Sequence, residues 1–168
     1  KILSFKYEKS INENRIKLIY EIIKRKYKKV IFIDSDDLMV KNRVSFCKKF
    51  LKKNKIVVND LNIFNKDTKL LKKNYFSSRI KNKAIINKMD LNSKNFFGMS
   101  NTSCNVSILK KLNLNILKDA PIFDWALWVL ALRNNNAIFI KEYNVEINPA
   151  EYLYTGNITA RSLRSGSV

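Results

Sequence analysis

Three carboxylates, Asp34, Asp36 and Asp37, lie within four positions of one another in this chain. They follow residues 30–33, a run of apolar and mostly β-branched residues of the kind that forms a buried strand. Carboxylates this close repel one another unless a cation neutralises them, which suggests a metal ion with oxygen ligands. The spacing therefore favours a metal site just past a strand end, where open α/β sheets also bind ligands. A solvated acidic turn is the alternative.

Other residues that could bind or catalyse lie in three further segments. Arg15 lies on a predicted helix, where its alternative role is that of a surface cation. Gly98, Ser100 and Asn101 belong to a stretch with one of only three glycines in the chain and many small polar residues. Such a stretch is typical of a loop that approaches a ligand closely. Asp124 opens an apolar helical pattern, and the helix dipole favours a carboxylate there whether or not it does chemistry.

The composition excludes several kinds of site. The chain has no histidine, which removes a Ser-His-Asp triad, a Cys-His pair and histidine-ligated zinc or haem. Cys47 and Cys104 are far apart and form no C-x-x-C motif, so we expect reduced thiols in a cytoplasmic protein. No segment approaches the roughly 20 apolar residues of a membrane span. Carboxylates, lysines, tyrosines and the two thiols remain as the groups that could do chemistry.

Charge and length bound the partners and the domain organisation. The net charge is +19, from 33 Lys and Arg against 14 Asp and Glu. Such a charge attracts nucleic acid, anionic membranes or phosphorylated substrates, although a bias toward Lys, Asn and Ile accounts for part of it. The 168 residues, 46% of them hydrophobic, predict a single domain, residues 1–168, with a tail at 149–168. Because the sequence begins at Lys1 rather than Met, we expect the domain to be incomplete at its N-terminus.

Hydrophobic periodicity predicts strands that alternate with helices, with Asn42 as the N-cap of one helix. The predicted strands are residues 2–7, 30–33, 56–58, 95–106 and 137–140, and the predicted helices are residues 13–27, 43–54, 77–89, 107–112 and 123–133. This alternation predicts an α/β sandwich in which a mostly parallel central sheet carries helices on both faces.

Two interpretations of the acids from other functional classes stay open. An apolar strand followed by Asp-x-Asp-x-Thr is the motif of haloacid-dehalogenase-like phosphatases, in which the first acid, here Asp34, is the nucleophile. Leu38 stands where that motif has Thr, and no second acidic pair follows, since Asp60 and Asp67 stand singly. A nucleic-acid-binding module would suit the charge, but the chain has no RNP-like run, zinc spacing or Gly-x-x-Gly clamp, so nucleic acid is disfavoured.

The chain resembles the family 2 nucleotide-sugar glycosyltransferases of GT-A type, particularly bacterial enzymes of surface-polysaccharide assembly. The resemblance covers residues 10–160 and rests on Asn14-Arg15, residues 30–37, residues 95–102 and residues 124–128. It implies a GT-A (Rossmann-like) fold and an inverting hexosyltransferase. The donor would be a nucleotide-diphosphate sugar, with a UDP-sugar favoured, and the acceptor a saccharide or lipid-linked saccharide. We expect a cytoplasmic protein whose basic surface holds it on the anionic inner face of the cell membrane.

The resemblance assigns the acids and Arg15 to the donor. Asp36, with Asp34 and Asp37 beside it, would hold Mn²⁺ or Mg²⁺ against the two phosphates, so that the nucleoside diphosphate departs with its charge neutralised. Arg15 would lie near the nucleotide.

The resemblance assigns the remaining residues to the sugars. Asp124 would be the general base that takes the proton of the acceptor hydroxyl, and Gly98, Ser100 and Asn101 would line the donor-sugar and acceptor side. Phe123 departs from the family, which usually has Glu there. The family's first strand and its acid for the nucleobase would precede residue 1.

Overall fold

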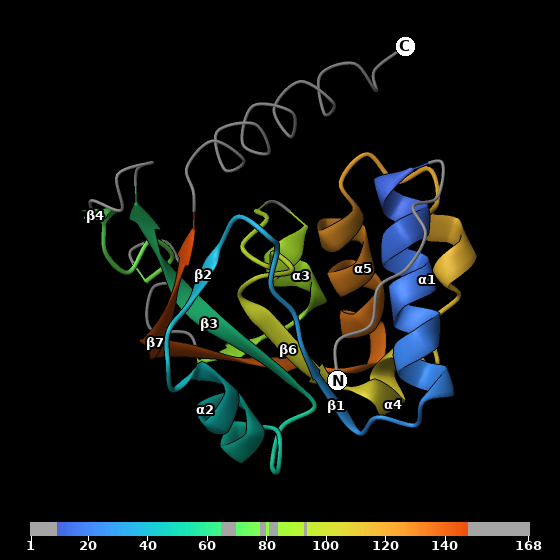
Figure 1. The fold of residues 1–168 in the computed structure, drawn as a ribbon, viewed down its shortest axis with the longest axis horizontal. Helices are drawn as coiled ribbons and strands as arrows, with labels where there is room; N and C mark the ends of the chain where they lie inside the picture. The colour runs from blue at the N-terminus through green and yellow to red at the C-terminus, as the bar shows by residue number, and fades with distance from the viewer. Residues whose placement is uncertain (1–9, 65–69, 78–79, 81–83, 93, 148–168) are drawn as a thin grey trace.

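The computed structural model describes residues 10–64, 70–77, 80, 84–92 and 94–147, and it is a mixed α/β fold (Figure 1). The helices are α1 (Ile11–Lys24), α2 (Arg43–Phe50), α3 (Lys88–Leu91), α4 (Val106–Leu109) and α5 (Phe123–Ala131), with 3₁₀ helices η1 (Leu114–Leu117) and η2 (Leu132–Asn134). The strands are β1 (Lys29–Ile31), β2 (Leu38–Met39), β3 (Ile56–Phe64), β4 (Leu70–Lys72), β5 (Ile85–Ile86), β6 (Thr102–Asn105) and β7 (Ala137–Ile147).

Helix α1 forms where the apolar periodicity predicts it. Ser10 is its N-cap, and the Ser10 side chain accepts a hydrogen bond from the backbone N–H of Glu13. Ile16 and Ile19 are buried on its inner face. The cap fixes the residue at which the helix starts, and the apolar face fixes which side of the helix packs on the core. Arg15 therefore lies near the N-terminal end of α1.

The sheet has the strand order β1-β6-β3-β7-β2, with β4 added beside β3 and β5 beside β7. Strand β6 is antiparallel to both β1 and β3, whereas β3 is parallel to β7. Strands β1, β3 and β7 therefore run in the same direction. We use the name carboxyl edge for the side of the sheet at which β1 stops and β6 starts. The opposite side, at which β1 starts and β6 stops, is the amino edge.

The prediction of a mostly parallel sheet is wrong for the described strands, because β3 with β7 is the one parallel pairing among them. A parallel neighbour needs a crossover that returns the chain to the opposite edge. The chain enters β6 from a loop that already lies at the carboxyl edge, so β6 must run backwards between β1 and β3. Helix α5 does supply a crossover, and β7 accordingly starts level with the start of β3, with Ala137 opposite Ile56.

Helices cover both faces of the sheet, as the sequence predicts. Ile56 and Val58 of β3 join the main core with α1 and α5, whereas Val57 packs on the other face with Leu51, which follows α2. Successive side chains of a strand point to opposite faces, so β3 contributes apolar side chains to the core on each face of the sheet. Trp128 of α5 is fully buried in the main core.

The remaining predictions concern one helix, the two cysteines, the terminal segments and a membrane span. The helix predicted over residues 77–89 is wrong, since residues 85–86 form β5 and a separate short helix, α3, begins at Lys88. Cys47 and Cys104 are buried free thiols. The strand predicted at residues 2–7 and the tail at 149–168 lie outside the described residues. Within the part of the chain that is described, none of the helices combines the length and apolar character needed to cross a bilayer.

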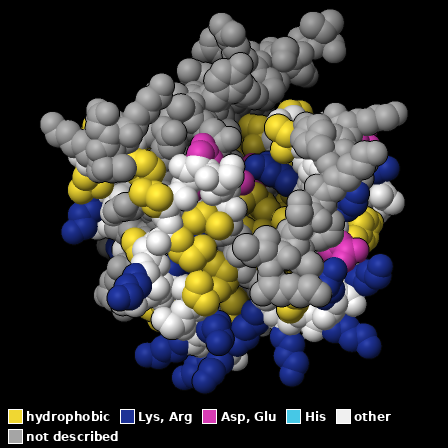
Figure 2. Space-filling model, viewed as in Figure 1, with side chains coloured by type: hydrophobic (Ala, Val, Ile, Leu, Met, Phe, Trp, Pro, Cys, Tyr) yellow, Lys and Arg dark blue, Asp and Glu magenta, His cyan; other side chains and the backbone are white. Residues whose placement is uncertain are grey.

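Lys and Arg side chains are concentrated along the lower edge of the molecule in the orientation of Figure 2. The lower ends of α1 and α2 reach the same edge in Figure 1. The charge is therefore unevenly distributed over the described surface.

Candidate functional site

Residues 34–37, which we call the acidic turn, follow β1 and are hydrogen-bonded to the loop that precedes β6. The backbone N–H of Asp34 donates to Ser100 Oγ at 2.8 Å, and the Ser100 hydroxyl lies 3.2 Å from Asp34 Oδ2, to which it donates. The N–H of Asp37 donates to the Asp34 carbonyl at 3.3 Å, which closes the turn. Two of the residues predicted to act together, Asp34 and Ser100, are thus in direct contact at the carboxyl edge.

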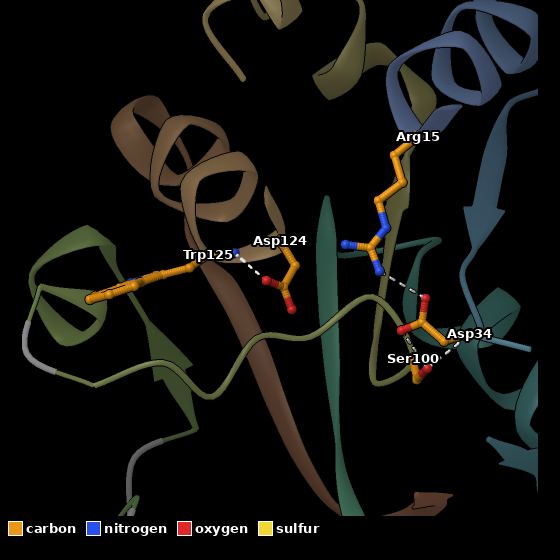
Figure 3. Close-up of polar contacts among 5 residues, drawn as sticks. All are labelled: Arg15, Asp34, Ser100, Asp124 and Trp125. Carbon is orange, nitrogen blue, oxygen red and sulfur yellow. Dashed lines mark hydrogen bonds and ion pairs between the residues drawn. The ribbon is translucent and has the colours of Figure 1, made fainter. Parts of the chain in front are cut away.

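Arg15 lies between the acidic turn and the start of α5 (Figure 3). Its Nη2 donates to Asp34 Oδ1 at 3.2 Å, and its guanidinium lies 5.7 Å from the centre of the Phe123 ring. The side chains of Arg15 and Asp34 keep 28% and 27% of their surface exposed, so solvent weakens the ion pair. A ligand that enters here would meet a guanidinium already beside a carboxylate.

Asp124 occupies the first turn of α5, on the other side of Arg15. Its Oδ1 accepts a hydrogen bond from the Trp125 N–H at 2.9 Å. Burial raises the pKa of Asp124 to about 6, while the Arg15 charge and this hydrogen bond oppose the rise and the Asp34 charge adds to it. Asp124 is therefore a carboxylate whose pKa lies close to neutral pH, as a general base requires.

Gly98 brings the backbone of the loop against Asp124. A Cβ on Gly98 would lie 3.6 Å from Asp124 Oδ2 and 3.5 Å from Asn101 Oδ1. These are ordinary contact distances, so a methyl group would fit here without a clash and would lie against the Asp124 carboxylate. Gly98 thus lies beside Asp124.

Asn101 shapes the loop from within. Its Nδ2 donates to the carbonyls of Asn59 at 3.1 Å and Phe96 at 3.0 Å, and its Oδ1 accepts from the Gly98 N–H at 2.8 Å. Only 1% of Asn101 is exposed. Both amide hydrogens are therefore engaged, and the side chain holds Gly98 and Ser100 in place instead of reaching outward.

The three acids of the turn do not gather around one point. Asp34 contacts Arg15 and Ser100, Asp37 lies close enough to Arg43 to act on its charge, and Asp36 is exposed. Among the described residues, no three His, Cys, Asp or Glu side chains converge as a metal site would require. A cage of three carboxylates therefore does not fit. One exposed carboxylate, Asp36, does fit the way Mg²⁺ binds, through one or two carboxylates together with substrate phosphates.

Arg43 underlies the acidic turn and was not singled out from the sequence. It is fully buried at the start of α2, and its Nη1 donates to the Phe32 carbonyl at 2.9 Å. Its Nε and Nη2 have no hydrogen-bond partner within the described residues. Burial lowers the pKa of Arg43, and the nearby Cys47 and Asp37 oppose that shift. A single arginine next to an N-cap gives no sequence signal that distinguishes it from the exposed cations of this basic chain.

Arg43→Met is expected to lower the free energy of unfolding by no more than about 1 kcal/mol, or to raise it. The reason is that an apolar side chain of similar length replaces a buried charge that is incompletely paired. Arg43→Ala, the matched variant, leaves a cavity and should destabilise by about 2–4 kcal/mol. Urea unfolding followed by circular dichroism measures both. Equal destabilisation by Met and Ala would show that the charge itself stabilises the fold.

Asp60 is a second residue whose role the sequence did not reveal. It is fully buried in β3, and its carboxylate accepts backbone hydrogen bonds from Leu61 and Phe76, both at 2.8 Å, and from Ser77 at 3.0 Å. The Ser77 hydroxyl donates to it as well. Asp60 therefore fixes residues 75–77 against the sheet and is a structural acid.

The geometry thus brings together Arg15, Asp34, Gly98, Ser100, Asn101 and Asp124, while Asp36 and Asp37 extend from the same turn. Comparison of the chain with family models, curated proteins and solved structures gives no significant match. A function must therefore be argued from these residues and their arrangement.

Proposed function

We propose that the chain is the catalytic domain of an inverting glycosyltransferase of the GT-A type. In this proposal it transfers a hexose from a nucleotide-diphosphate sugar to a hydroxyl of a saccharide acceptor. The observation that carries the proposal is the proximity of the acidic turn to Asp124. These residues are 90 positions apart, yet Arg15 lies between them and the charges of both Arg15 and Asp34 act on Asp124.

Asp124 acts as the base in this mechanism. Its carboxylate accepts the proton of the acceptor hydroxyl while that oxygen forms a bond to the anomeric carbon, and the bond from that carbon to the donor phosphate breaks. The pKa of about 6 leaves Asp124 ionised at pH 7. In this proposal the acceptor hydroxyl approaches Asp124 along Gly98, which carries no side chain and adjoins Asp124 Oδ2.

In this proposal the donor phosphates bind at the acidic turn. Asp36 is the exposed residue that would hold Mn²⁺ or Mg²⁺ there, with Asp34 and Asp37 beside it. The ion would supply neutralisation of the charge on the leaving diphosphate. Arg15, already adjacent, offers a guanidinium fork that matches a phosphate in geometry and charge.

The test is binding of Mn²⁺ and of UDP-, GDP-, CDP- and dTDP-sugars by the full-length protein, measured by isothermal titration calorimetry, together with Mn²⁺-dependent donor hydrolysis. Asp36→Ala is expected to weaken donor binding in the presence of Mn²⁺ by about 10–100-fold, the range seen when a metal site loses one supporting group. Glu21→Ala is the control, because it removes a carboxylate from the distant part of α1, where Glu21 pairs with Lys24 and Arg25.

Failure of every nucleotide sugar to bind would contradict the proposal, as would equal effects of Asp36→Ala and Glu21→Ala. Turnover of p-nitrophenyl phosphate that is lost in Asp34→Asn would instead establish the phosphatase alternative, in which Asp34 is the nucleophile.

A further inference from the structure

Three segments distant in sequence bring their cations together at the amino edge. The carbonyl of Lys28 accepts from the Val106 N–H at 3.0 Å, and that of Lys55 accepts from the Asn105 N–H at 2.9 Å. Lys29 Nζ donates to the Lys48 carbonyl at 3.2 Å. The turns that follow α1 and α2 therefore meet the start of α4, and all three lie at the bottom of the molecule in Figure 1.

We call this surface the basic face. Its exposed cations are Lys24, Arg25, Lys26, Lys28, Lys48, Lys49, Lys52, Lys53, Lys55, Lys110 and Lys111. Within residues 21–29, 48–55 and 106–111, Glu21 is the one acid, and it pairs with Lys24 and Arg25. Figure 2 shows dark blue side chains crowded along the lower edge, the edge that the lower ends of α1 and α2 reach in Figure 1. The face is thus a concentration of positive charge with little internal neutralisation.

Helix dipoles explain only part of this arrangement. Cations in the last turn of a helix stabilise it, which accounts for Lys24 in α1 and for Lys48 and Lys49 in α2. That effect falls off within one turn. Most of the cations lie beyond the helix ends, where mutual repulsion gives the folded chain no benefit.

The chemistry of the face favours a lipid surface over a nucleic acid. All its cations except Arg25 are lysines, and Arg25 Nε already donates to Glu21 at 3.2 Å. Lysines are point charges without the planar fork that reads phosphates or bases in a fixed geometry. Tyr27, 52% exposed within the face, has the amphipathic ring that suits the headgroup level of a bilayer.

We propose that the basic face docks the protein on a bilayer that contains anionic phospholipid. Each lysine near such a surface contributes about five-fold in affinity. This inference does not depend on the glycosyltransferase proposal, because none of its residues belongs to the candidate site.

The test is co-sedimentation with vesicles of phosphatidylcholine, with and without phosphatidylglycerol, at low salt. The protein is expected to bind only the anionic vesicles. A variant with Lys48, Lys49, Lys52 and Lys53 all changed to Gln should bind them at least about 30-fold more weakly. The matched control changes Lys41, Lys73, Lys94 and Lys118 to Gln, which are exposed cations outside the face, and should lose less than about five-fold for the same change in net charge.

Circular dichroism shows whether both variants remain folded, and Lys52→Gln with Lys53→Gln is the fallback pair, since both residues lie outside helix α2. Equal losses in the face variant and the control would overturn the proposal, because they would reflect net charge alone. Absence of binding to the anionic vesicles would also overturn it. Salt-sensitive binding of random RNA that the face variant loses, with vesicle binding unchanged, would assign the face to nucleic acid instead.

Discussion

Asp124→Asn is expected to reduce the rate of glycosyl transfer by about 10²–10⁴-fold, the usual contribution of a positioned general base. Asn preserves the size of the side chain and can still accept the Trp125 N–H bond that Asp124 makes at 2.9 Å, so the fold should persist. The amide cannot take a proton from the acceptor. Donor binding, which depends on the acidic turn, should change little, and steady-state kinetics should place the loss in kcat.

The pH dependence provides the control for this prediction. Transfer by the wild-type protein should fall as the pH drops through about 6, because protonation of Asp124 removes the base. Folding stability has the opposite dependence on this group. Its pKa is raised from the model-compound value of 3.8 to about 6, so its contribution to stability is complete below about pH 4 and is lost as the pH rises through about 6. A variant that keeps wild-type kcat would show that Asp124 is only a helix-terminal residue.

Asp60→Ala is expected to destabilise the protein by about 3–5 kcal/mol, as is usual when one member of a buried polar network is removed. The backbone N–H groups of Leu61, Phe76 and Ser77 would each lose their acceptor. Urea unfolding is the measurement.

Asp60→Asn is the matched variant for that prediction. The bonds from Leu61 and Phe76 go to Oδ1 and that from Ser77 goes to Oδ2. An amide retains one oxygen, so it can keep the first two bonds and should lose the third, which predicts an intermediate stability. A stability for Asp60→Ala within about 1 kcal/mol of wild type would mean that residues 75–77 are held by other contacts.

The sequence predicted the parts of the site that local patterns control. An apolar run ending in acids placed Asp34 at a strand end, and an apolar helical pattern opening with a carboxylate placed Asp124 at the start of α5. Their proximity was inferred from a family resemblance. The structure supplies a physical link between them, since Arg15 pairs with Asp34 and lies between the two carboxylates.

The sequence could not predict what depends on contacts between distant residues. Strand β6 runs backwards because of where the preceding loop lies, which no local pattern encodes. Residues 85–86 pair with β7 instead of continuing a helix, a case in which tertiary pairing overrides propensity. Asn101 looked like a ligand-binding residue by type, yet its hydrogen bonds to Asn59 and Phe96 make it part of the scaffold.

Helix α1 carries Arg15 at the candidate site and Lys24 at the basic face, a rise of about 14 Å at 1.5 Å per residue. With the basic face on a bilayer, the helix would act as a spacer that sets the height of the site above the lipid headgroups. A sugar joined directly to a lipid headgroup would then be too close to the membrane to reach Asp124. Together the two proposals predict acceptors whose reactive end extends well above the bilayer, such as a glycan already several units long or one that is free in solution.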